Sequence, residues 1–399
     1  MYSADLHTHS RFAIGTSNRL SLENLSYWGR RKGLDLISTG DFTHPIWFTE
    51  LKHSLTESED GIYEFNNQKF VLGTEVSCVA KDRGRTRKVH ILILASSLES
   101  STRITRDLSY HSKNLASDGR LTVRLTPSEL LELSLRSDSE SLIIPSHIWT
   151  PWYGLLGSRS GYNSLEECFR EKTPLIRAVE TGLSSDPEMC MRIPELRNVA
   201  TVSFSDAHSG QNLGREVTYF DEHLSFPALR SQIVKKQVKK TIEYFPEEGK
   251  YYASGHRKCG VVKVNGNPGI CPICGTNLTE GVSSRIAELA GSQGKTVEST
   301  PADCPPSIKL IGLKKIISEC IGLGPSSKSV DFEYQGIVEH AGSELSALTE
   351  LPIEELAQFC PAKVVEGIDL VRRGEIRISP GYDGKYGEVS IWDKCLTNS

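Results

Sequence analysis

The sequence has no long apolar run and no strong excess of charge of either sign. No stretch of about 18 consecutive apolar residues occurs, so we expect no membrane span. The first residues, MYSADLHTHS, lack the basic and apolar segments of a signal peptide, and we expect a cytoplasmic protein. Lys and Arg number 46 against 50 Asp and Glu, a net charge of −4, so any surface for nucleic acid must be local.

Internal repeats and low-complexity tracts are also missing. With 399 residues the chain exceeds one ordinary hydrophobic core, and two or three domains are expected. Ten cysteines occur without an export signal. In a reducing compartment they should be thiols or metal ligands rather than disulfides.

Up to about residue 245, short apolar runs alternate with helical patterns. The runs are almost continuously apolar, as in parallel strands that are buried on both faces. Between them, Thr126 and Glu129 have the spacing of a capping box at the start of a helix. The alternation predicts an α/β barrel or a wound sheet. The predicted strands are 34–39, 69–73, 88–94, 141–145, 175–180 and 199–205.

The alternation stops at the sequence FPEEG, residues 245–249. We therefore expect three parts: an α/β domain at 1–245, a small cysteine-containing module at 246–280, and a mainly helical region at 281–399. Within the last part, helices are predicted around 307–320, 343–358 and 361–373. That part also contains the glycine-punctuated loop PGYDGKYG at 380–387.

Histidines and carboxylates gather at the predicted strand ends, where α/β barrels assemble their active sites. A lone histidine at a strand end is usually structural, but seven or more such residues are hard to attribute to chance. Imidazole and carboxylate groups together bind divalent metals. Two or three ions such as Zn²⁺, Mn²⁺ or Mg²⁺ would bind a phosphate oxygen and activate a water molecule. The candidates are His7, His9, Asp41, Glu75, His90, His147, Glu180, Asp206 and His208.

A second metal motif lies in the predicted module. His256, Cys259, Cys271 and Cys274 have the spacing of four ligands around one tetrahedral zinc ion. Four protein ligands leave no open coordination position, so this zinc should be structural. Four unconnected side chains are the alternative.

Basic and aromatic residues flank the candidate ligands. Residues 81–88 carry five basic groups and one acid, and we expect Arg83, Arg85 and Arg87 to contact a phosphate backbone. A solvated protein face is the alternative. Three aromatic residues after His147 are either core residues or a platform on which a base stacks. They are Trp149, Trp152 and Tyr153.

Six motifs resemble, in order, those of the PHP (polymerase and histidinol phosphatase) family: DLHTHS, TGDFTH, GTEVS, VHILIL, PSHIW and SFSDAH. The resemblance implies a distorted seven-stranded β/α barrel with up to three metal ions. Asp41 falls where the family has a histidine, and His44 is its rival. We expect Asp206, His9 and Glu75 to be catalytic. The ligand positions carried over are His7, His9, Glu75, His90, His147, Asp206 and His208.

The order of barrel, zinc module, helical region and terminal loop resembles the endonuclease Q family. This resemblance implies an endonuclease that hydrolyses the phosphodiester 5′ to uracil, hypoxanthine or xanthine in DNA, and at abasic sites. A damaged base would be flipped out of the duplex. The alternatives are a small-molecule phosphoesterase similar to histidinol phosphatase and a non-catalytic nucleic-acid-binding scaffold.

Overall fold

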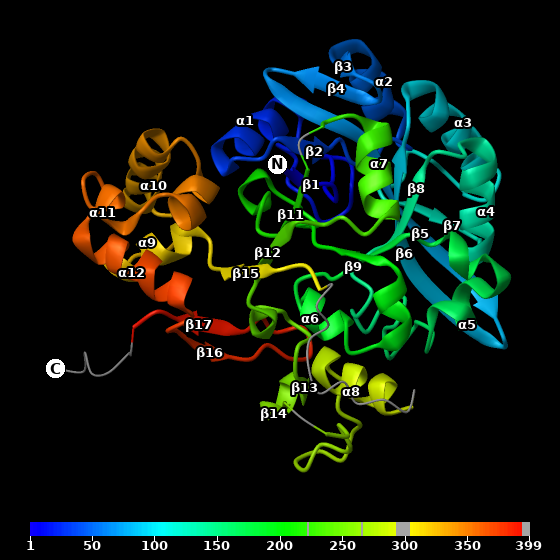
Figure 1. The fold of residues 1–399 in the computed structure, drawn as a ribbon. Helices are drawn as coiled ribbons and strands as arrows, with labels where there is room; N and C mark the ends of the chain where they lie inside the picture. Colours follow the sequence, from blue (N-terminus) through cyan, green and yellow to red (C-terminus); the bar gives the residue numbers. More distant parts are fainter. Residues whose placement is uncertain (222, 265, 293–303, 393–399) are drawn as a thin grey trace.

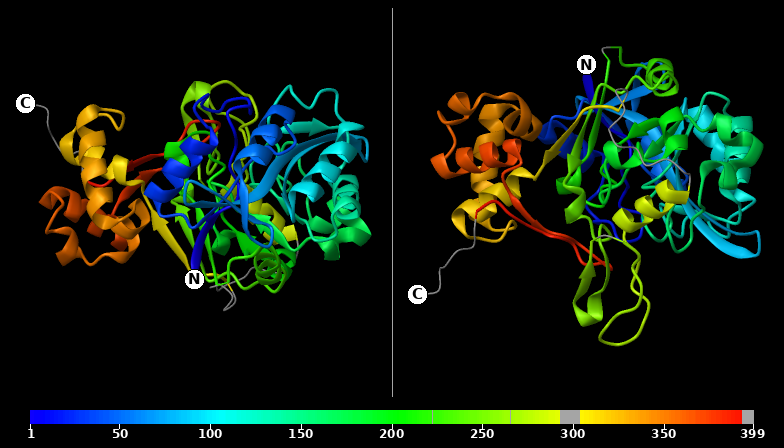
Figure 2. Two further views of the ribbon diagram at one scale, coloured as in Figure 1. Left: turned by 90° about the horizontal axis from the view of Figure 1, so that it is seen from above. Right: turned by 60° about the horizontal axis from the view of Figure 1, so that its bottom comes forward.

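A mixed central sheet covered by helices makes the chain an α/β protein, as the sequence predicts (Figure 1). The computed structural model describes residues 1–221, 223–264, 266–292 and 304–392. Helices α3 and α4 lie along one side of the sheet, and the helical carboxyl-terminal region lies on the opposite side (Figures 1 and 2). The described part of the chain has no helix with both the length and the apolar character of a membrane span.

The central sheet contains 11 strands. Its hydrogen-bonded path runs β15-β12-β11-β1-β2-β5-β4-β3, and β6, β7 and β8 join it through β5 and β6. Strands β1, β2 and β5 are parallel, but β1 pairs with β11 and β5 with β6 in antiparallel fashion, so the expectation of parallel strands is only partly right. The strands are β1 (Tyr2–Asp5), β2 (Leu36–Ser38), β3 (Thr56–Glu59), β4 (Ile62–Phe65), β5 (Gln68–Asp82), β6 (Arg85–Ala95), β7 (Leu121–Val123), β8 (Leu142–Pro145), β11 (Val217–Phe220), β12 (Lys240–Tyr244) and β15 (Ser307–Leu310).

Strands β5 and β6 form a hairpin that is much longer than the sequence predicts. Arg83 and Gly84 connect them with φ angles of 49° and 78°, the left-handed backbone that a two-residue hairpin turn requires. The predicted strands 69–73 and 88–94 lie inside this hairpin. Glu75 and His90 are therefore in the middle of strands. The expectation that Glu75 lies just past a strand end is wrong, whereas His90 lies within its strand as predicted.

Two further strands, β9 (Ala178–Glu180) and β10 (Ala200–Val202), pair in parallel as a separate sheet. Thr8 after β1 and Ala207 after β10 form an isolated bridge. Side chains from nine strands share one hydrophobic cluster, as the inward-facing residues of a closed sheet would. The closed seven-stranded barrel stays a prediction that this cluster supports. Its strand members include Ala4, Leu36, Val71, Leu92, Ile144, Ala178 and Val202.

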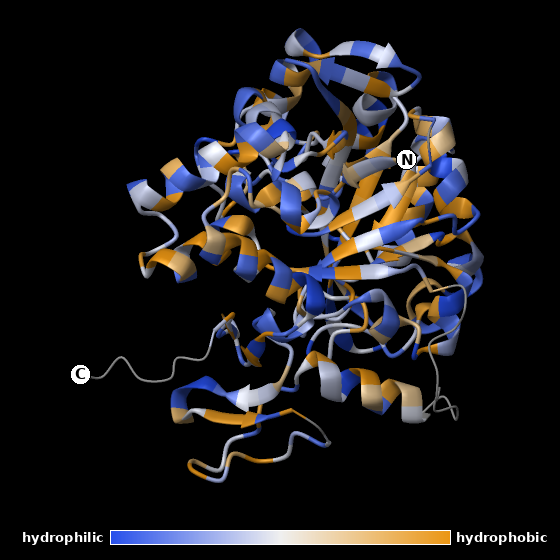
Figure 3. Cartoon of the chain, turned by 60° about the vertical axis from the view of Figure 1, so that its left-hand side comes forward, coloured by the Kyte–Doolittle hydropathy of each residue, from blue (hydrophilic) through white to orange (hydrophobic). Residues whose placement is uncertain are grey.

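Short amphipathic helices cover the sheet, and their hydrophobic and hydrophilic residues alternate along each helix (Figure 3). The predicted capping box is confirmed: Glu129 N–H donates to the Thr126 side chain, and the Glu129 carboxylate accepts from Thr126 N–H. The helices of this part are α1 (Leu22–Lys32), α2 (Pro45–Ser54), α3 (Leu98–Ser109), α4 (Pro127–Ser137), α5 (Leu165–Phe169), α6 (Pro187–Cys190) and α7 (Phe226–Val234).

Beyond residue 245 the described residues form a small hairpin, an edge strand of the central sheet, five α-helices and a second hairpin. The predicted helix around 307–320 is partly wrong, because Ser307–Leu310 is strand β15, which pairs in parallel with β12 at the edge of the central sheet. Tertiary pairing thus overrides a pattern that is too short to identify alone. The elements are β13 (Ser254–His256), β14 (Val261–Lys263), α8 (Val282–Ser292), α9 (Leu313–Ile321), α10 (Lys328–Ala341), α11 (Ile353–Leu356), α12 (Ala362–Arg373), β16 (Arg377–Ser379) and β17 (Glu388–Ser390).

The loop between β16 and β17 folds back onto the small β13–β14 hairpin. The Asp383 carboxylate accepts hydrogen bonds from Arg257 N–H at 2.8 Å and from the Thr279 hydroxyl at 2.7 Å. Gly381 N–H donates to the Glu247 carbonyl at 2.8 Å, and its own carbonyl accepts from Ala253 N–H at 2.9 Å. Residues 380–387 therefore tie the cysteine-containing segment to the end of the chain.

Candidate metal centre

Six of the predicted ligands converge on one point. His7 and His9 follow β1, Glu75 lies in β5 and His90 in the antiparallel β6. The structure brings their ligand atoms together in two groups, and Glu75 belongs to both. The first group is His7, His9, Glu75 and Asp206, and the second is Glu75, His90 and His147.

The two oxygens of Glu75 point toward different partners. Oε1 lies 3.0 Å from His90 Nδ1, 3.2 Å from His147 Nε2 and 3.4 Å from His7 Nε2. Oε2 lies 3.6 Å from His9 Nε2. A carboxylate in this position can contact two metal ions at once.

Each of three imidazoles is held from behind at its Nδ1 atom. His7 Nδ1 lies 2.9 Å from Glu180, and His9 Nδ1 lies 3.0 Å from Asp41. His147 Nδ1 lies 2.9 Å from the Thr150 hydroxyl. Such contacts fix the ring orientation and direct Nε2 into the site, as the partners of metal-binding histidines do.

Three residues at the site have left-handed backbone conformations. Asp41, His147 and Asp206 have φ angles of 49°, 29° and 47°. These conformations are uncommon for residues other than glycine, and they concentrate at functional sites, where the surrounding structure enforces them. Gly40 precedes Asp41 and lets the backbone pass close to Thr8 at this point. A Cβ atom on Gly40 would lie 2.6 Å from the Thr8 carbonyl oxygen.

The site favours divalent cations. Burial alone would raise the pKa of Glu75, but His90 and His7 hold it well below its usual range. Burial lowers the pKa of His90 to about 4, whereas the surrounding carboxylates raise the pKa values of His7 and His9. His7 Nε2 is fully buried and has no hydrogen-bond partner within the described structure. A buried imidazole nitrogen without a partner, among ionised carboxylates, fits a metal ion.

Four predicted residues lie outside the two ligand groups, and one of them is Glu180, which stands behind His7. Asp41 stands behind His9 and accepts hydrogen bonds from Ser10 N–H and its hydroxyl at 2.7 Å each. The His208 ring packs 4.7 Å from that of His9 and lines the cavity. His44 caps α2 and stacks on Phe12. The structure therefore gives Asp41 and His208 supporting positions and His44 a structural one.

A cavity of about 630 Å³ opens beside the metal ligands. The aromatic rings of Trp152 and Tyr251 lie 5.8 Å apart at its wall, and the Lys250 ammonium lies 5.8 Å from the Tyr386 ring. The wall thus joins the loop after β8 to the segment before β13 and to the terminal loop. Such a cavity has room and aromatic surface for a nucleobase.

The residues that the sequence predicts to contact nucleic acid differ in how exposed their side chains are. Trp149 is 1% exposed and donates its indole N–H to Cys190, so it offers no open face. Arg87 donates to the Gly161 carbonyl and pairs with Glu167. The exposed residues are Trp152, Arg83 and Arg85, and the Tyr153 ring packs on His90 at 4.4 Å.

Arg120 is a candidate site residue that sequence analysis missed. Its Nη1 atom lies 3.4 Å from Glu75 Oε2, and its side chain lines the cavity. It precedes β7 and belongs to none of the six motifs. Only the pairing of β7 with β5, in which Leu121 lies beside Val76, brings it to the site.

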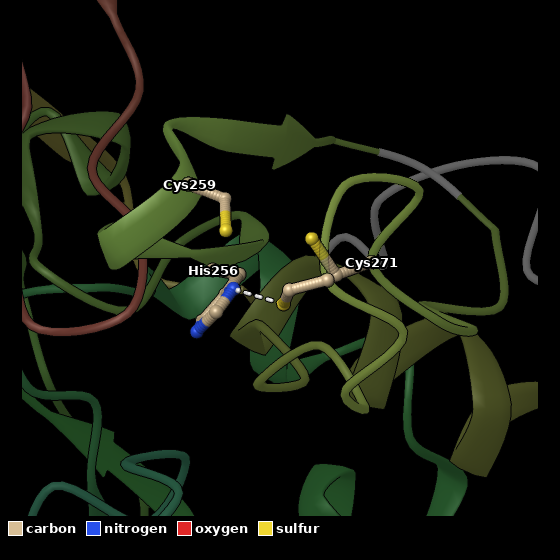
Figure 4. A group of neighbouring side chains, drawn as sticks. His256, Cys259 and Cys271 are labelled. Atoms are coloured by element: carbon tan, nitrogen blue, oxygen red, sulfur yellow. Dashed lines mark hydrogen bonds between the residues drawn. The ribbon is translucent and has the colours of Figure 1, made fainter.

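The four predicted zinc ligands also come together. His256, Cys259, Cys271 and Cys274 form a third group of converging ligand atoms, and His256 Nδ1 lies 3.3 Å from Cys274 Sγ. Figure 4 shows His256, Cys259 and Cys271 directed toward a common point. Three sulfur atoms and one imidazole fit a closed tetrahedral zinc site.

Comparisons with known proteins cover the whole chain. The crystal structure of the lesion-specific endonuclease PfuEndoQ from Pyrococcus furiosus is 30% identical and superposes with a TM-score of 0.86 over 100% of this chain and 97% of that one. A crystal structure of endonuclease Q with a 27-mer duplex that carries an abasic lesion at the active site is 30% identical, with a TM-score of 0.88 over 99% and 98%.

Two further matches concern parts of the chain. The model of the MJ0043 C-terminal domain family matches residues 312–375. The uncharacterized protein MJ0043 of Methanocaldococcus jannaschii is 34% identical over 277 residues, which are 65% of this chain and 34% of that protein. The chain thus spans about a third of the length of that relative.

Fold and site define an α/β protein with a two-part centre of histidine and carboxylate side chains. The 30% identity over nearly the full length of both chains identifies it further: the chain belongs to the endonuclease Q family.

Proposed function

We propose that this protein is a metal-dependent endonuclease that cuts DNA on the 5′ side of deaminated bases and at abasic sites. The observation that carries the proposal is the pair of ligand groups that share Glu75. Membership of the endonuclease Q family supports it, and one relative contains duplex DNA with an abasic lesion at its active site. Uracil, hypoxanthine and xanthine are the proposed damaged bases.

The catalytic groups are those of the two ligand groups. Two divalent ions, with Zn²⁺, Mn²⁺ and Mg²⁺ as the candidates, would lower the pKa of a water molecule and bind phosphate oxygens. His9, Glu75 and Asp206 hold them. Arg120 directs a guanidinium toward the same point, where it can pair with a phosphate oxygen.

The cavity beside the ligands accepts the damaged nucleotide. Trp152 offers an exposed aromatic face, and Tyr251 and Tyr386 complete the wall. A deaminated base carries a carbonyl where its parent base carries an amine. A donor in the wall therefore satisfies the damaged base and opposes the parent, a difference of about 1–3 kcal/mol for each unsatisfied group.

The test uses 5′-labelled duplexes that differ at one position, which holds cytosine, uracil or an abasic site. We expect a divalent metal to support cleavage of the last two on the 5′ side of the lesion and to leave cytosine intact. Hydrolysis of a phosphomonoester without nicking would favour a small-molecule phosphoesterase. Binding of DNA without any hydrolysis would favour a scaffold.

A further inference from the structure

A second cavity lies next to the metal centre. It measures about 780 Å³, and Thr122 lines both cavities. Its floor is the face of the sheet that β5 and β7 share, and its rim is the segment that follows α3. The two cavities therefore form one continuous surface.

The strand register explains this continuity. Strands β5 and β7 are parallel, and Ser77 lies beside Thr122. Side chains two residues apart share a face of a strand, so Glu75, Ser77 and Lys81 lie along one line. At about 3.3 Å per residue this line runs about 20 Å outward from the shared metal ligand. In β7, Thr122 is exposed between the buried Leu121 and Val123, so its side chain faces solvent along the same line.

The second cavity is strongly basic. Lys81, Lys113 and Arg124 line it, and within the described residues no ion pair or hydrogen bond of their side chains is found. Glu129 is the acid among its lining residues, and the capping box engages its carboxylate, which accepts from Thr126 N–H and hydroxyl at 2.8 Å each. Three cations thus face the cavity while its carboxylate is already bound.

We propose that this basic track, defined by Lys81, Lys113 and Arg124, binds the phosphodiester backbone of the DNA strand whose scissile phosphate lies at the metal centre. The proposal rests on the endonuclease function proposed above. A strand that lies across the shared Thr122 would leave the metal centre with its phosphates over the track.

The spacing of the cations fits a polymer better than a small anion. They come from three separate segments: β5, the loop after α3 and the residue after β7. Each phosphate that a protein cation neutralises releases counterions, so binding weakens with salt by a slope of about 0.9 per contact for duplex DNA. If the basic track contacts phosphates, removing its cations must therefore reduce the salt dependence of DNA binding.

The test compares the wild type with the double variant Lys113→Ala/Arg124→Ala. The enzyme concentration that gives half-maximal single-turnover cleavage of an abasic duplex is measured over a series of salt concentrations. We expect this concentration to rise at least tenfold near physiological salt, and the logarithmic slope to fall by about 1.8, or 0.9 for each lost contact.

The matched control is Lys52→Ala/Lys235→Ala, which removes the same charge from residues that line neither cavity. The control should keep the wild-type slope. A Lys113→Ala/Arg124→Ala variant with the wild-type slope, or with the same change as the control, would overturn the proposal. A wild type that leaves abasic DNA uncut rejects the endonuclease function itself, a result that is distinct from the failure of the track.

A second experiment locates the track on the DNA. Neutral methylphosphonates replace the phosphates on the 5′ or the 3′ flank of the lesion. On the flank that contacts the track, the neutral groups should weaken DNA binding by the wild type. They should not weaken binding further in the double variant, which has already lost the contact. Additive losses on both flanks would contradict a direct contact between the track and the backbone.

Discussion

At the scale of single residues, the groups behind the imidazoles decide how well the metal centre is preformed. Glu180 is fully buried, contacts His7 Nδ1 and also accepts a hydrogen bond from His147 N–H at 2.7 Å. One carboxylate therefore positions a member of each ligand group. Its contribution should appear in metal affinity before it appears in folding.

We predict that Glu180→Gln lowers metal affinity by about 10–100-fold, the usual effect of losing the partner of a ligating histidine. The amide keeps the shape but loses the charge that faces His7. Metal titration with a competing chelator measures the affinity. Glu354→Gln, an exchange at an exposed residue of α11, is the control. An unchanged affinity would show that Glu180 has no part in the centre.

Two carboxylates are buried away from the metal ligands. Burial raises the pKa of Glu243 to about 8, and burial with the nearby Glu243 charge raises that of Glu216 well above its usual range. The Ser203 hydroxyl donates to Glu243 at 2.6 Å. Asp186 also raises the pKa of Glu243, whereas Lys309 lowers it. The folded protein therefore holds protons here that the unfolded chain releases near pH 4.5.

Consequently, the free energy of unfolding should fall as pH rises from about 4.5 to about 8, by up to about 1.4 kcal/mol per pH unit for one proton. Glu243→Gln removes a titrating group, so its stability should depend less on pH in this window and exceed that of the wild type at pH 8. Denaturant unfolding at several pH values measures this. Parallel curves for variant and wild type would exclude a buried neutral Glu243.

Much of the site can be predicted from the sequence because its ligands belong to short local motifs. His7 and His9 stand two residues apart just after β1, and Cys271 and Cys274 have the spacing of a zinc knuckle. Arg120 cannot be predicted in this way, because only the register between β5 and β7 brings it close to Glu75. The burial of Trp149 is equally hard to predict, because the sequence does not show which side of a loop faces the core.

At the scale of elements, one buried ion pair joins the helical region to α1. Lys32 Nζ lies 2.6 Å from Glu344, and both side chains are largely buried. The same carboxylate accepts from Leu313 N–H at 3.0 Å, at the start of α9, and from the Tyr334 hydroxyl at 2.8 Å. Glu344 thus joins three elements.

We predict that Glu344→Ala lowers the free energy of unfolding by about 3–5 kcal/mol, because it leaves Lys32 buried without a partner. Asp369→Ala breaks the exposed Asp369–Arg373 pair, which is worth about 0.5 kcal/mol at most. Denaturant unfolding compares the two. Equal losses would mean that Glu344 contributes no more than a surface charge.

The zinc module gives a separate prediction. Cys271→Ser should remove one zinc ion per chain and lower the protection of residues 246–280 in hydrogen exchange, because metal binding contributes folding free energy to such a module. The protection of β1 and β2 should be unchanged. Full zinc content in purified Cys271→Ser would show that the four residues do not form the site.

Elements with strong patterns are predictable, and short paired ones are not. The runs 34–39 and 141–145 contain β2 and β8. Strands β11, β12 and β15 have four or five residues each and obtain their partners from distant parts of the chain. A pattern of this length carries little signal without its neighbours. The sequence pattern underestimates the length of the β5–β6 hairpin because polar residues continue both strands beyond their apolar core.

At the scale of the whole molecule, the cavity is assembled from distant parts of the sequence. His90 and Trp152 come from the first half of the chain, Lys250 and Tyr251 from the segment before β13, and Tyr386 from the terminal loop. Asp383 holds this last wall in place through Arg257 and Thr279. No single part of the chain contains the complete cavity.

This arrangement has a consequence for protein synthesis. A nascent chain that has left the ribosome up to residue 380 already carries every ligand of the metal centre, yet it lacks Asp383 and Tyr386. The cavity is therefore complete only after the residues of the terminal loop have been added.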